Sequence, residues 1–407
     1  MRLLHISSSA LTAVSIGLLV ACGMDVGAAQ GGESTAQFAA EDVLQVPESW
    51  IGHEFGLNAP VVRDVRALDA SRRASGEGAT SDMVVFDAAR NISYELEYDR
   101  AAVAAVADKM QARMIAQTKL TAASTTEADS EALVQKAIVG TDGRQRLGIA
   151  DGYAKDFFPF SAIGKVRTNT GRTCTGTLVA ERLVLTAAHC VLNSSHQFQQ
   201  GTFDPRIDGT NSNVYLNPVQ PWGSWQYTTG AVSNEFINRN CMNTAGNGGL
   251  QNPNPECFGA DWAVLIVDQP AGMGHPGAMC YAWHTDKSVL NTYFVYTGGY
   301  PACGISGSPA NCKNDTLYGD SRDCVLGADV SFDSSGYARG TDFDCDISGG
   351  QSGSPIYVYY PAWLSGCTAA VIGVESGNRP LNGAYINTMR RLTPELTNYM
   401  TLLDSLF

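Results

Sequence analysis

From Ala137 to the end of the chain, short apolar runs alternate with clusters of Gly, Asn, Pro and Asp. Stretches such as "GNGGLQNPNP" and "SFDSSGYARG" separate the apolar runs and are typical of turns between strands. Runs this short and this evenly interrupted indicate antiparallel strands rather than helices. The pattern therefore predicts an all-β fold for residues 137–407.

One helix is predicted at the C-terminus, over residues 393–404. Thr393 can cap its first turn, and Pro394 suits the first helical position. Apolar side chains then follow at the spacing of one helix face, at Leu396, Tyr399, Met400 and Leu403.

Residues 23–136 differ from the β-rich part in composition and in predicted secondary structure. A tail of small residues leads to one helical stretch, "DRAAVAAVADKMQARMIAQTKL" (99–120), and then to the polar run "TAASTTEADSE". This composition predicts a loosely built leader that precedes the β-rich part. At 407 residues, the chain is long enough for at least two such parts.

The first 22 residues carry an export signal. Arg2 is followed by the apolar run Ala10–Ala21, which is too short to span a bilayer but suits the core of a signal peptide. The run ends in "LVAC", which resembles the bacterial lipoprotein box and makes Cys22 a candidate for lipidation. The alternative is ordinary cleavage nearby, after Ala28, with Cys22 discarded. Later stretches are too short to span a membrane, so a lipid on the leader is the expected membrane attachment.

The cysteines support export. Ten of the eleven lie between Cys174 and Cys367, and an even set of this kind predicts up to five disulfides in an oxidising compartment. Zinc is the alternative for clustered cysteines, but the chain has neither a CxxC pair nor paired histidines. We expect no metal and no cofactor.

The charge balance argues against nucleic acid as a partner. The chain has 40 acidic and 27 basic side chains, for a net charge of −13, whereas phosphate binding requires a positive face. We expect a monomer that acts on proteins or peptides.

One histidine has a distinctive setting. The stretch "CTGTLVAERLVLTAAHCV" (Cys174–Val191) places His189 next to Cys190. A Cys174–Cys190 bridge would close a loop of 16 residues, contribute about 3 kcal/mol on the chain-entropy model, and fix the segment that presents His189. A positioned histidine is the general base that a serine nucleophile requires.

A carboxylate that orients this imidazole is expected at the start of an apolar strand. In "GADWAVLIVDQP", Asp261 precedes the apolar run, and its buried carboxylate would require a partner. Asp268 is the weaker alternative, because it follows the strand.

Two similar turns offer a serine between glycines, "GISGSP" with Ser306 and "GQSGSP" with Ser352. Ser352 follows two glycines and precedes the strand-like run "IYVYY", so the amides of Gly350 and Ser352 can converge on a developing oxyanion. Ser306 lies between Cys303 and Cys312, in what reads as a small surface loop. Ser352 is therefore the candidate nucleophile.

In this order, TAAHC, GADWAVL and SGGQSGSP resemble the chymotrypsin-like serine proteases, and most closely the bacterial glutamyl-endopeptidase branch. The resemblance covers residues 137 to about 400 and implies two six-stranded antiparallel barrels, at about 137–268 and 269–390. It also implies a triad of Ser352, His189 and Asp261. "AIVGTDGR" resembles the start of the mature chain in that branch, which predicts activation by cleavage between Lys136 and Ala137.

The family pattern fails at several positions. Gln351 replaces the Asp that pairs with the new N-terminus in trypsin. The Thr and His on which Glu selectivity depends in the glutamyl branch are replaced by Ile347 and Glu375. Asp346 has the spacing of the pocket-base Asp of trypsin-like enzymes. Together, Asp346 and Glu375 favour Lys or Arg before the scissile bond; an apolar or broad preference and a Glu preference are the alternatives.

The sequence thus predicts an exported serine endopeptidase made as a zymogen. The competing hypothesis is a catalytically inactive binding module on the same fold. All three triad candidates are present, which favours the enzyme.

Overall fold

The computed structural model describes residues 62–67, 83–89, 92–98 and 142–407, apart from 210–218, 243–253, 270, 273, 285–286, 305–307, 321, 335, 362–366 and 382–383. Several features predicted from the sequence lie outside the described residues. These are the signal segment with Cys22, the helical stretch at 99–120, the Lys136–Ala137 cleavage site and Ser306.

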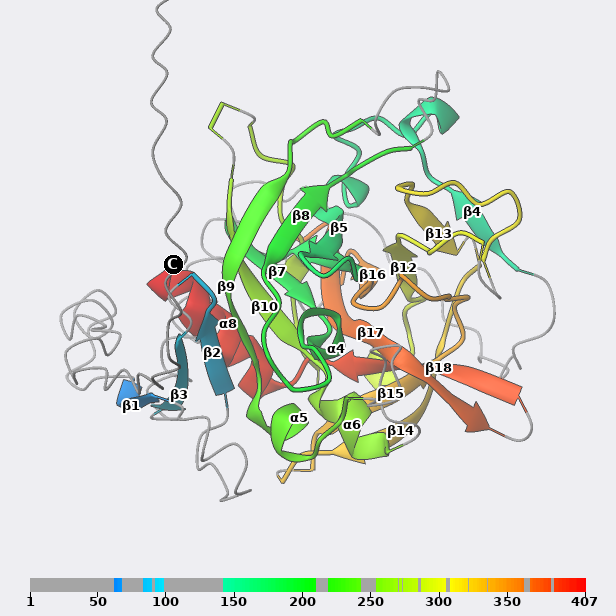
Figure 1. The fold of residues 1–407 in the computed structure, drawn as a ribbon. Coiled ribbons are helices and arrows are strands. Elements are labelled where there is room, and N and C mark those ends of the chain that lie inside the picture. Colours follow the sequence, from blue (N-terminus) through cyan, green and yellow to red (C-terminus); the bar gives the residue numbers. More distant parts are fainter. Residues whose placement is uncertain are drawn as a thin grey trace, which may run out of the picture. The chain divides into compact units, whose positions relative to one another are not determined.

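The described chain is built mainly from strands, arranged in two nine-stranded sheets (Figure 1). The strands of the first sheet are β1 (Val62–Ala67), β2 (Met83–Asp87), β3 (Ile92–Tyr98), β5 (Ile163–Thr168), β6 (Thr173–Leu178), β7 (Leu183–Thr186), β8 (Gly201–Pro205), β9 (Trp225–Ser233) and β10 (Ala263–Asp268). Those of the second sheet are β4 (Arg144–Arg146), β11 (Cys280–Tyr281), β12 (Tyr296–Gly299), β13 (Tyr318–Asp320), β14 (Leu326–Phe332), β15 (Ala338–Phe343), β16 (Pro355–Tyr359), β17 (Ala369–Leu381) and β18 (Ala384–Arg391).

The helices are short except at the C-terminus. The α-helices are α4 (Ala188–Val191), α5 (Asn234–Asn238), α6 (Pro255–Ala260), α7 (Lys287–Leu290) and α8 (Pro394–Leu406), with 3-10 turns at Ile149–Asp151 and Phe160–Ala162. The all-β fold class with a C-terminal helix is therefore confirmed. In α8 the Thr393 hydroxyl accepts a hydrogen bond from the Leu396 amide, and Pro394 stands in the first turn.

Six strands of the first sheet close into a barrel. They pair in the order β5-β6-β7-β10-β9-β8, and β8 pairs with both β9 and β5, which completes the ring. β7 and β10 read as almost continuous apolar runs because both of their faces are covered. One face lies in the barrel core, and α8 packs against β7 from outside.

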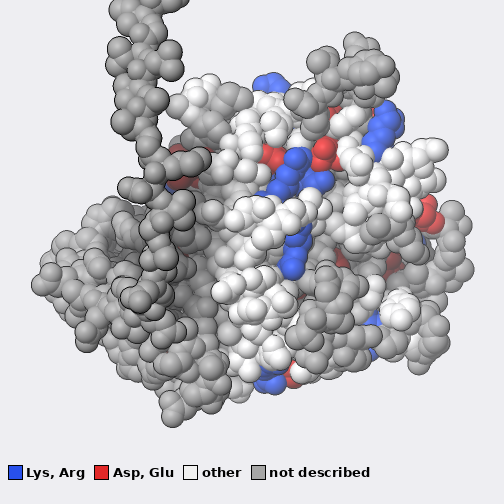
Figure 2. Space-filling model, in the orientation of Figure 1, with Lys and Arg blue, Asp and Glu red and all other residues white. Residues whose placement is uncertain are grey.

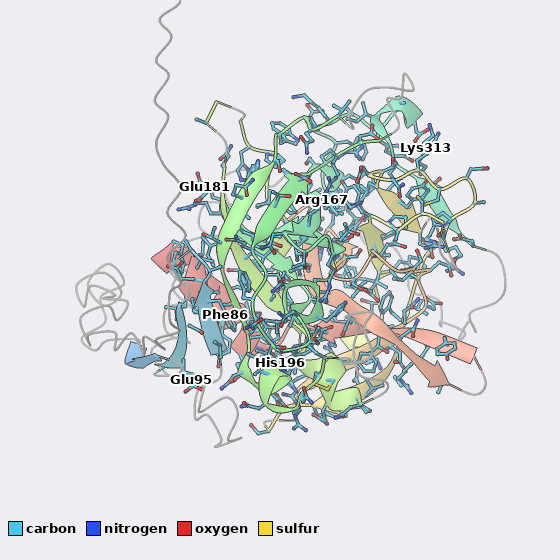
Figure 3. The ribbon with its side chains drawn as sticks, viewed as in Figure 1. Phe86, Glu95, Arg167, Glu181, His196 and Lys313 are labelled. Atoms are coloured by element: carbon cyan, nitrogen blue, oxygen red, sulfur yellow. A yellow bond between two sulfur atoms is a disulfide. The ribbon has the colours of Figure 1, made fainter. Side chains whose placement is uncertain are left out.

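Three strands from the segment predicted to be a leader extend this first sheet, which the sequence did not predict. β2 runs antiparallel to β9, with Met83 opposite Ser233 and Asp87 opposite Thr229, and β3 and β1 follow outward. Residues Met83–Phe86 are at most 4% exposed. Phe86, labelled in Figure 3, stacks on Phe198 with ring centroids 5.5 Å apart. This part of the leader is packed into the sheet instead of being loosely built.

The second half contains a run of six antiparallel strands in the order β14-β15-β18-β17-β16-β12. An isolated bridge between Val295 and Cys324 brings the two ends of this run together. β13 and β4 continue the sheet beyond β12, so the strand at Arg144–Arg146 belongs to the second sheet although it precedes the first barrel in the sequence.

All ten cysteines from Cys174 onward form disulfides, which confirms the expected set of five. The pairs are Cys174–Cys190, Cys241–Cys257, Cys280–Cys367, Cys303–Cys312 and Cys324–Cys345. The fourth closes the small loop that contains Ser306.

Within the described residues, no helix is both long enough and apolar enough to cross a membrane. On the face drawn in Figure 2, most described side chains are uncharged, and blue and red side chains lie next to one another. The described part of that face is therefore mainly uncharged.

Candidate active site

His189 lies on α4, the single helical turn that follows β7. The Cys174–Cys190 disulfide ties this turn to β6, because Cys174 belongs to that strand and Cys190 is the next residue after His189. The His189 side chain is only 6% exposed. The backbone at His189 is thus fixed from two neighbouring strands, β6 and β7.

Asp261 meets His189 because β10 pairs with β7. Ala263 lies opposite Thr186, so the residues just before β10 and just after β7 are neighbours. Asp261 Oδ2 is 2.7 Å from His189 Nδ1, and Oδ1 accepts a hydrogen bond from the His189 amide at 3.0 Å. The Ser376 hydroxyl donates to Oδ2 at 2.6 Å. Three hydrogen bonds therefore satisfy a carboxylate that is fully buried.

The alternative carboxylate, Asp268, lies at the far end of β10. Its side chain is 71% exposed and pairs with Arg182 at 2.5 Å. The structure thus brings Asp261, and not Asp268, to the histidine.

The environment of His189 favours its protonated form. Burial lowers the pKa of the imidazole, but the charge of Asp261 and its hydrogen bond outweigh burial. The net effect raises the pKa of His189 above its ordinary value. An imidazolium that forms during a proton transfer would be stabilised by the same contacts.

Ser352 lies on the turn before β16, against the barrel that carries His189. Its carbonyl oxygen accepts a hydrogen bond from the Thr175 amide on β6 at 2.8 Å, and Cys190 Sγ lies 3.6 Å from that oxygen. Ser352 is partly exposed, whereas Gln351 and Gly353 on either side are buried. The turn therefore holds the serine backbone beside α4 and leaves the residue accessible.

The Ser352 turn requires glycine at Gly350. This residue has φ of +91°, and a Cβ there would lie 2.6 Å from Ala302 N and 2.7 Å from Tyr300 O. The Gly350 carbonyl accepts a hydrogen bond from Thr175 Oγ1 at 3.1 Å, which orients the peptide group. Among the described residues, neither the Gly350 amide nor the Ser352 amide has a hydrogen-bond acceptor. Both remain available to an incoming oxygen.

Glu375 is buried against the Ser352 turn instead of lying in an open pocket. It is 3% exposed, and its backbone is hydrogen-bonded to Gly353 and Ser354 on the serine turn. Burial raises the pKa of its carboxyl group to about 8, against a lowering by His189 and by a hydrogen bond from Ser352. At neutral pH this side chain is therefore mainly uncharged.

The other two pocket candidates also have specific partners. Asp346 accepts a hydrogen bond from the Gly143 amide at 2.7 Å and pairs with Arg322 at 2.8 Å. Arg322 also pairs with Asp320 at 2.6 Å. Ile347 packs at the edge of the second barrel's core. The positions of Asp346 and Glu375 in the sequence predicted two negative charges at the specificity pocket. In the structure Asp346 is ion-paired and Glu375 is buried.

Sequence reasoning missed two residues of this site. Ser376 bonds to Asp261 across 115 positions, and Arg144 bonds to Ser348 and Gln351 of the serine turn across more than 200. Ser376 directly follows Glu375 in the sequence "VIGVESGN", but nothing local marks it as a partner of the Asp261 carboxylate.

Two groups of described side chains are close enough to hold a metal ion: Cys174 with His189 and Cys190, and Asp320 with Cys324 and Cys345. In each group the two cysteines form a disulfide, so their sulfurs are not thiolates. Neither group offers a conventional set of metal ligands.

Comparison with known proteins finds similarity to serine proteases. The model of the trypsin family matches residues 148–220, which include His189. A glutamyl endopeptidase of Bacillus licheniformis is 22% identical over 268 residues, which cover 65% of this chain and 68% of that protein. Serine protease 23 of Mus musculus is 40% identical over 84 residues, and the match spans 20% of this chain and only 19% of that protein.

Among solved structures, a Glu endopeptidase in complex with MPD is 20% identical. It matches with a TM-score of 0.45 over 66% of this chain and 100% of that chain. The trypsin-family match over residues 148–220 and the match to the glutamyl endopeptidase support a serine endopeptidase similar to the trypsin-like proteases and related to the glutamyl endopeptidases.

Proposed function

We propose that this serine endopeptidase works through a triad of Ser352, His189 and Asp261 and is exported as a zymogen. The observation that carries the proposal is the buried pair of His189 and Asp261, together with Cys190 Sγ, which lies 3.8 Å from His189 Nε2 and 3.6 Å from the carbonyl oxygen of the partly exposed Ser352. A carboxylate that accepts from Nδ1–H leaves Nε2 as the proton acceptor, which is the tautomer that a serine nucleophile requires.

In the proposed reaction, Ser352 Oγ attacks the carbonyl carbon of the peptide bond while its proton passes to His189 Nε2. The amides of Gly350 and Ser352 donate to the oxyanion that forms. The C–N bond then breaks, and His189 returns the proton to the departing amine. Water, deprotonated by the same imidazole, releases the acid from the acyl-enzyme and restores the Ser352 hydroxyl.

Glu375 adds a feature to this cycle. The Ser352 side chain lowers the pKa of the Glu375 carboxyl group, against the larger effect of burial. During attack the Ser352 hydroxyl must donate its proton to His189 and not to Glu375. A protonated Glu375 competes less strongly for the serine proton than a carboxylate does, which suits reaction near neutral pH.

For the residue before the scissile bond we propose Lys or Arg. Arg322 is a single cation in contact with two carboxylates, Asp320 and Asp346, which leaves a net negative charge at the pocket-base position. The second candidate is Glu, favoured by Arg322 itself, whose side chain is 36% exposed, and by the likeness to a glutamyl endopeptidase.

Profiling a peptide library with the purified protein tests both parts of the proposal. We expect cleavage after Lys and Arg, and loss of all cleavage in Ser352→Ala. Ser306→Ala, which alters the matching turn, is the control and should cleave like the parent. Cleavage mainly after Glu would replace the basic preference by the second candidate, and cleavage that persists in Ser352→Ala would refute the triad.

We also propose that cleavage after Lys136 activates the enzyme and that any lipid on Cys22 stays with the leader. The β2–β9 pairing adds a condition: after the cut, the leader strands must leave the first sheet before the leader separates. N-terminal sequencing of the mature protein should give Ala137, and a mature chain that begins elsewhere would refute this site.

A further inference from the structure

Arg144 has an unusual set of contacts for a residue outside the triad. It lies in β4, opposite Asp320 of β13, and its side chain is 4% exposed. Nε and Nη2 donate to the two oxygens of Asp142, both at 2.9 Å. Nη1 then points at the segment before the nucleophile, where it donates to Ser348 Oγ at 2.6 Å and to Gln351 Oε1 at 2.8 Å.

Gln351 joins these contacts to the serine turn. Its side chain is fully buried, and Oε1 also accepts hydrogen bonds from the amide and the hydroxyl of Ser348. The backbone amide of Gln351 donates to Ser348 O at 3.0 Å, and the backbone carbonyl of Gln351 accepts a hydrogen bond from the Ser354 amide at 2.9 Å. Because a guanidinium can only donate, Arg144 also fixes which end of the Gln351 side chain faces it.

Residues 142–144 make a second contact with the segment that precedes Ser352. The Gly143 amide donates to Asp346 Oδ2 at 2.7 Å, five residues before Gln351. Residues 142–144 therefore hold residues 346–351 at two points. This held segment contains Gly350 and ends directly before Ser352, the two residues whose amides remain available to an oxyanion.

We propose that Arg144 is a positioning residue that holds the oxyanion turn in its working shape through Gln351 and Ser348. Gln351 is neutral and cannot form an ion pair with a chain-terminal amine. Gln351 instead accepts a hydrogen bond from the Arg144 guanidinium. Arg144 is an internal residue, so this contact does not require cleavage of the bond after Lys136. The inference rests on the proposed function, because it assigns a task to the turn that carries Ser352.

The test compares Arg144→Ala with Arg146→Ala in the purified protein. Arg146 is a matched control, because it lies on the same strand and also pairs with a carboxylate, Asp151, but does not touch the serine turn. We expect Arg144→Ala to lower kcat at least tenfold with KM within about threefold, since loss of a single oxyanion donor costs roughly 10²–10³ in kcat. Arg146→Ala should stay within about twofold. Added guanidinium should restore part of the kcat of Arg144→Ala, and Arg144→Lys should fall between that variant and the parent.

A second readout does not depend on activity. Hydrogen exchange followed by mass spectrometry should show faster exchange of the amides at 348–353 in Arg144→Ala and in Arg144→Lys, but not in Arg146→Ala. Unchanged kcat and unchanged exchange in Arg144→Ala would overturn the inference. Equal losses of kcat in Arg144→Ala and Arg146→Ala, in proportion to their losses of thermal stability, would also overturn the inference. An inactive parent protein would instead count against the proposed function, and the exchange measurement would still decide whether Arg144 holds the turn.

Discussion

Asp261→Asn is expected to lower kcat by about 10⁴-fold while the protein keeps its fold. The Asn side-chain oxygen can still accept a hydrogen bond from the His189 backbone amide. Its NH₂ group would face His189 Nδ1 and can only donate, so Nδ1 must be unprotonated to accept that hydrogen bond. The proton then sits on Nε2, and the imidazole cannot accept the proton of Ser352. Steady-state kinetics on a peptide substrate, with circular dichroism to check the fold, measure the effect.

Asp268→Asn is the matched control for this substitution. It removes the carboxylate at the other end of β10, where the side chain is exposed and pairs only with Arg182 among the described residues. An exposed pair of this kind contributes little to stability, so activity should remain within about twofold. If the two variants were equally active, Asp261 would have no part in orienting the base.

Glu375→Gln is expected to change how stability depends on pH. Burial raises the pKa of Glu375 in the folded protein from its ordinary 4.5 to about 8. Between these values the folded state keeps a proton that the unfolded chain has lost, so the contribution of this residue is fully present below pH 4.5 and declines as pH rises toward 8. Glutamine cannot ionise and avoids this loss. The difference in unfolding free energy between variant and parent should therefore shift by about 3 kcal/mol in favour of the variant from pH 5 to pH 8.

Urea unfolding at the two pH values measures this shift. Glu181→Gln serves as the control, because Glu181 is an exposed carboxylate on the surface of the first barrel (Figure 3). It should show the same difference from the parent at both pH values. A Glu375→Gln variant that also behaves identically at pH 5 and pH 8 would mean that the folded protein does not hold a proton on Glu375.

Much of this molecule could be predicted from local sequence. The turn residues between short apolar runs predicted the strands, and the even set of ten cysteines predicted five disulfides. The capping signals at Thr393 and Pro394 predicted α8. These features depend on neighbouring residues or on simple counting, so a single sequence contains the information.

The remaining features depend on contacts between distant segments. Asp346 and Glu375 suggested a charged pocket by their positions, but a sequence does not show that Arg322 reaches Asp346 or that Glu375 is buried. The leader strand β2 also gave no clear signal, because "MVVFD" is a short apolar run whose partner, β9, begins about 140 residues later. Charge pairing and burial are properties of the assembled fold.

The most direct test of the central claim is to identify the residue that reacts with a fluorophosphonate. After reaction of the purified protein, peptide mass spectrometry should find one phosphonate adduct, on Ser352, and the adduct should be absent in His189→Ala. No adduct, or an adduct on Ser306 with Ser352 unmodified, would contradict the assignment of Ser352 as a nucleophile activated by His189.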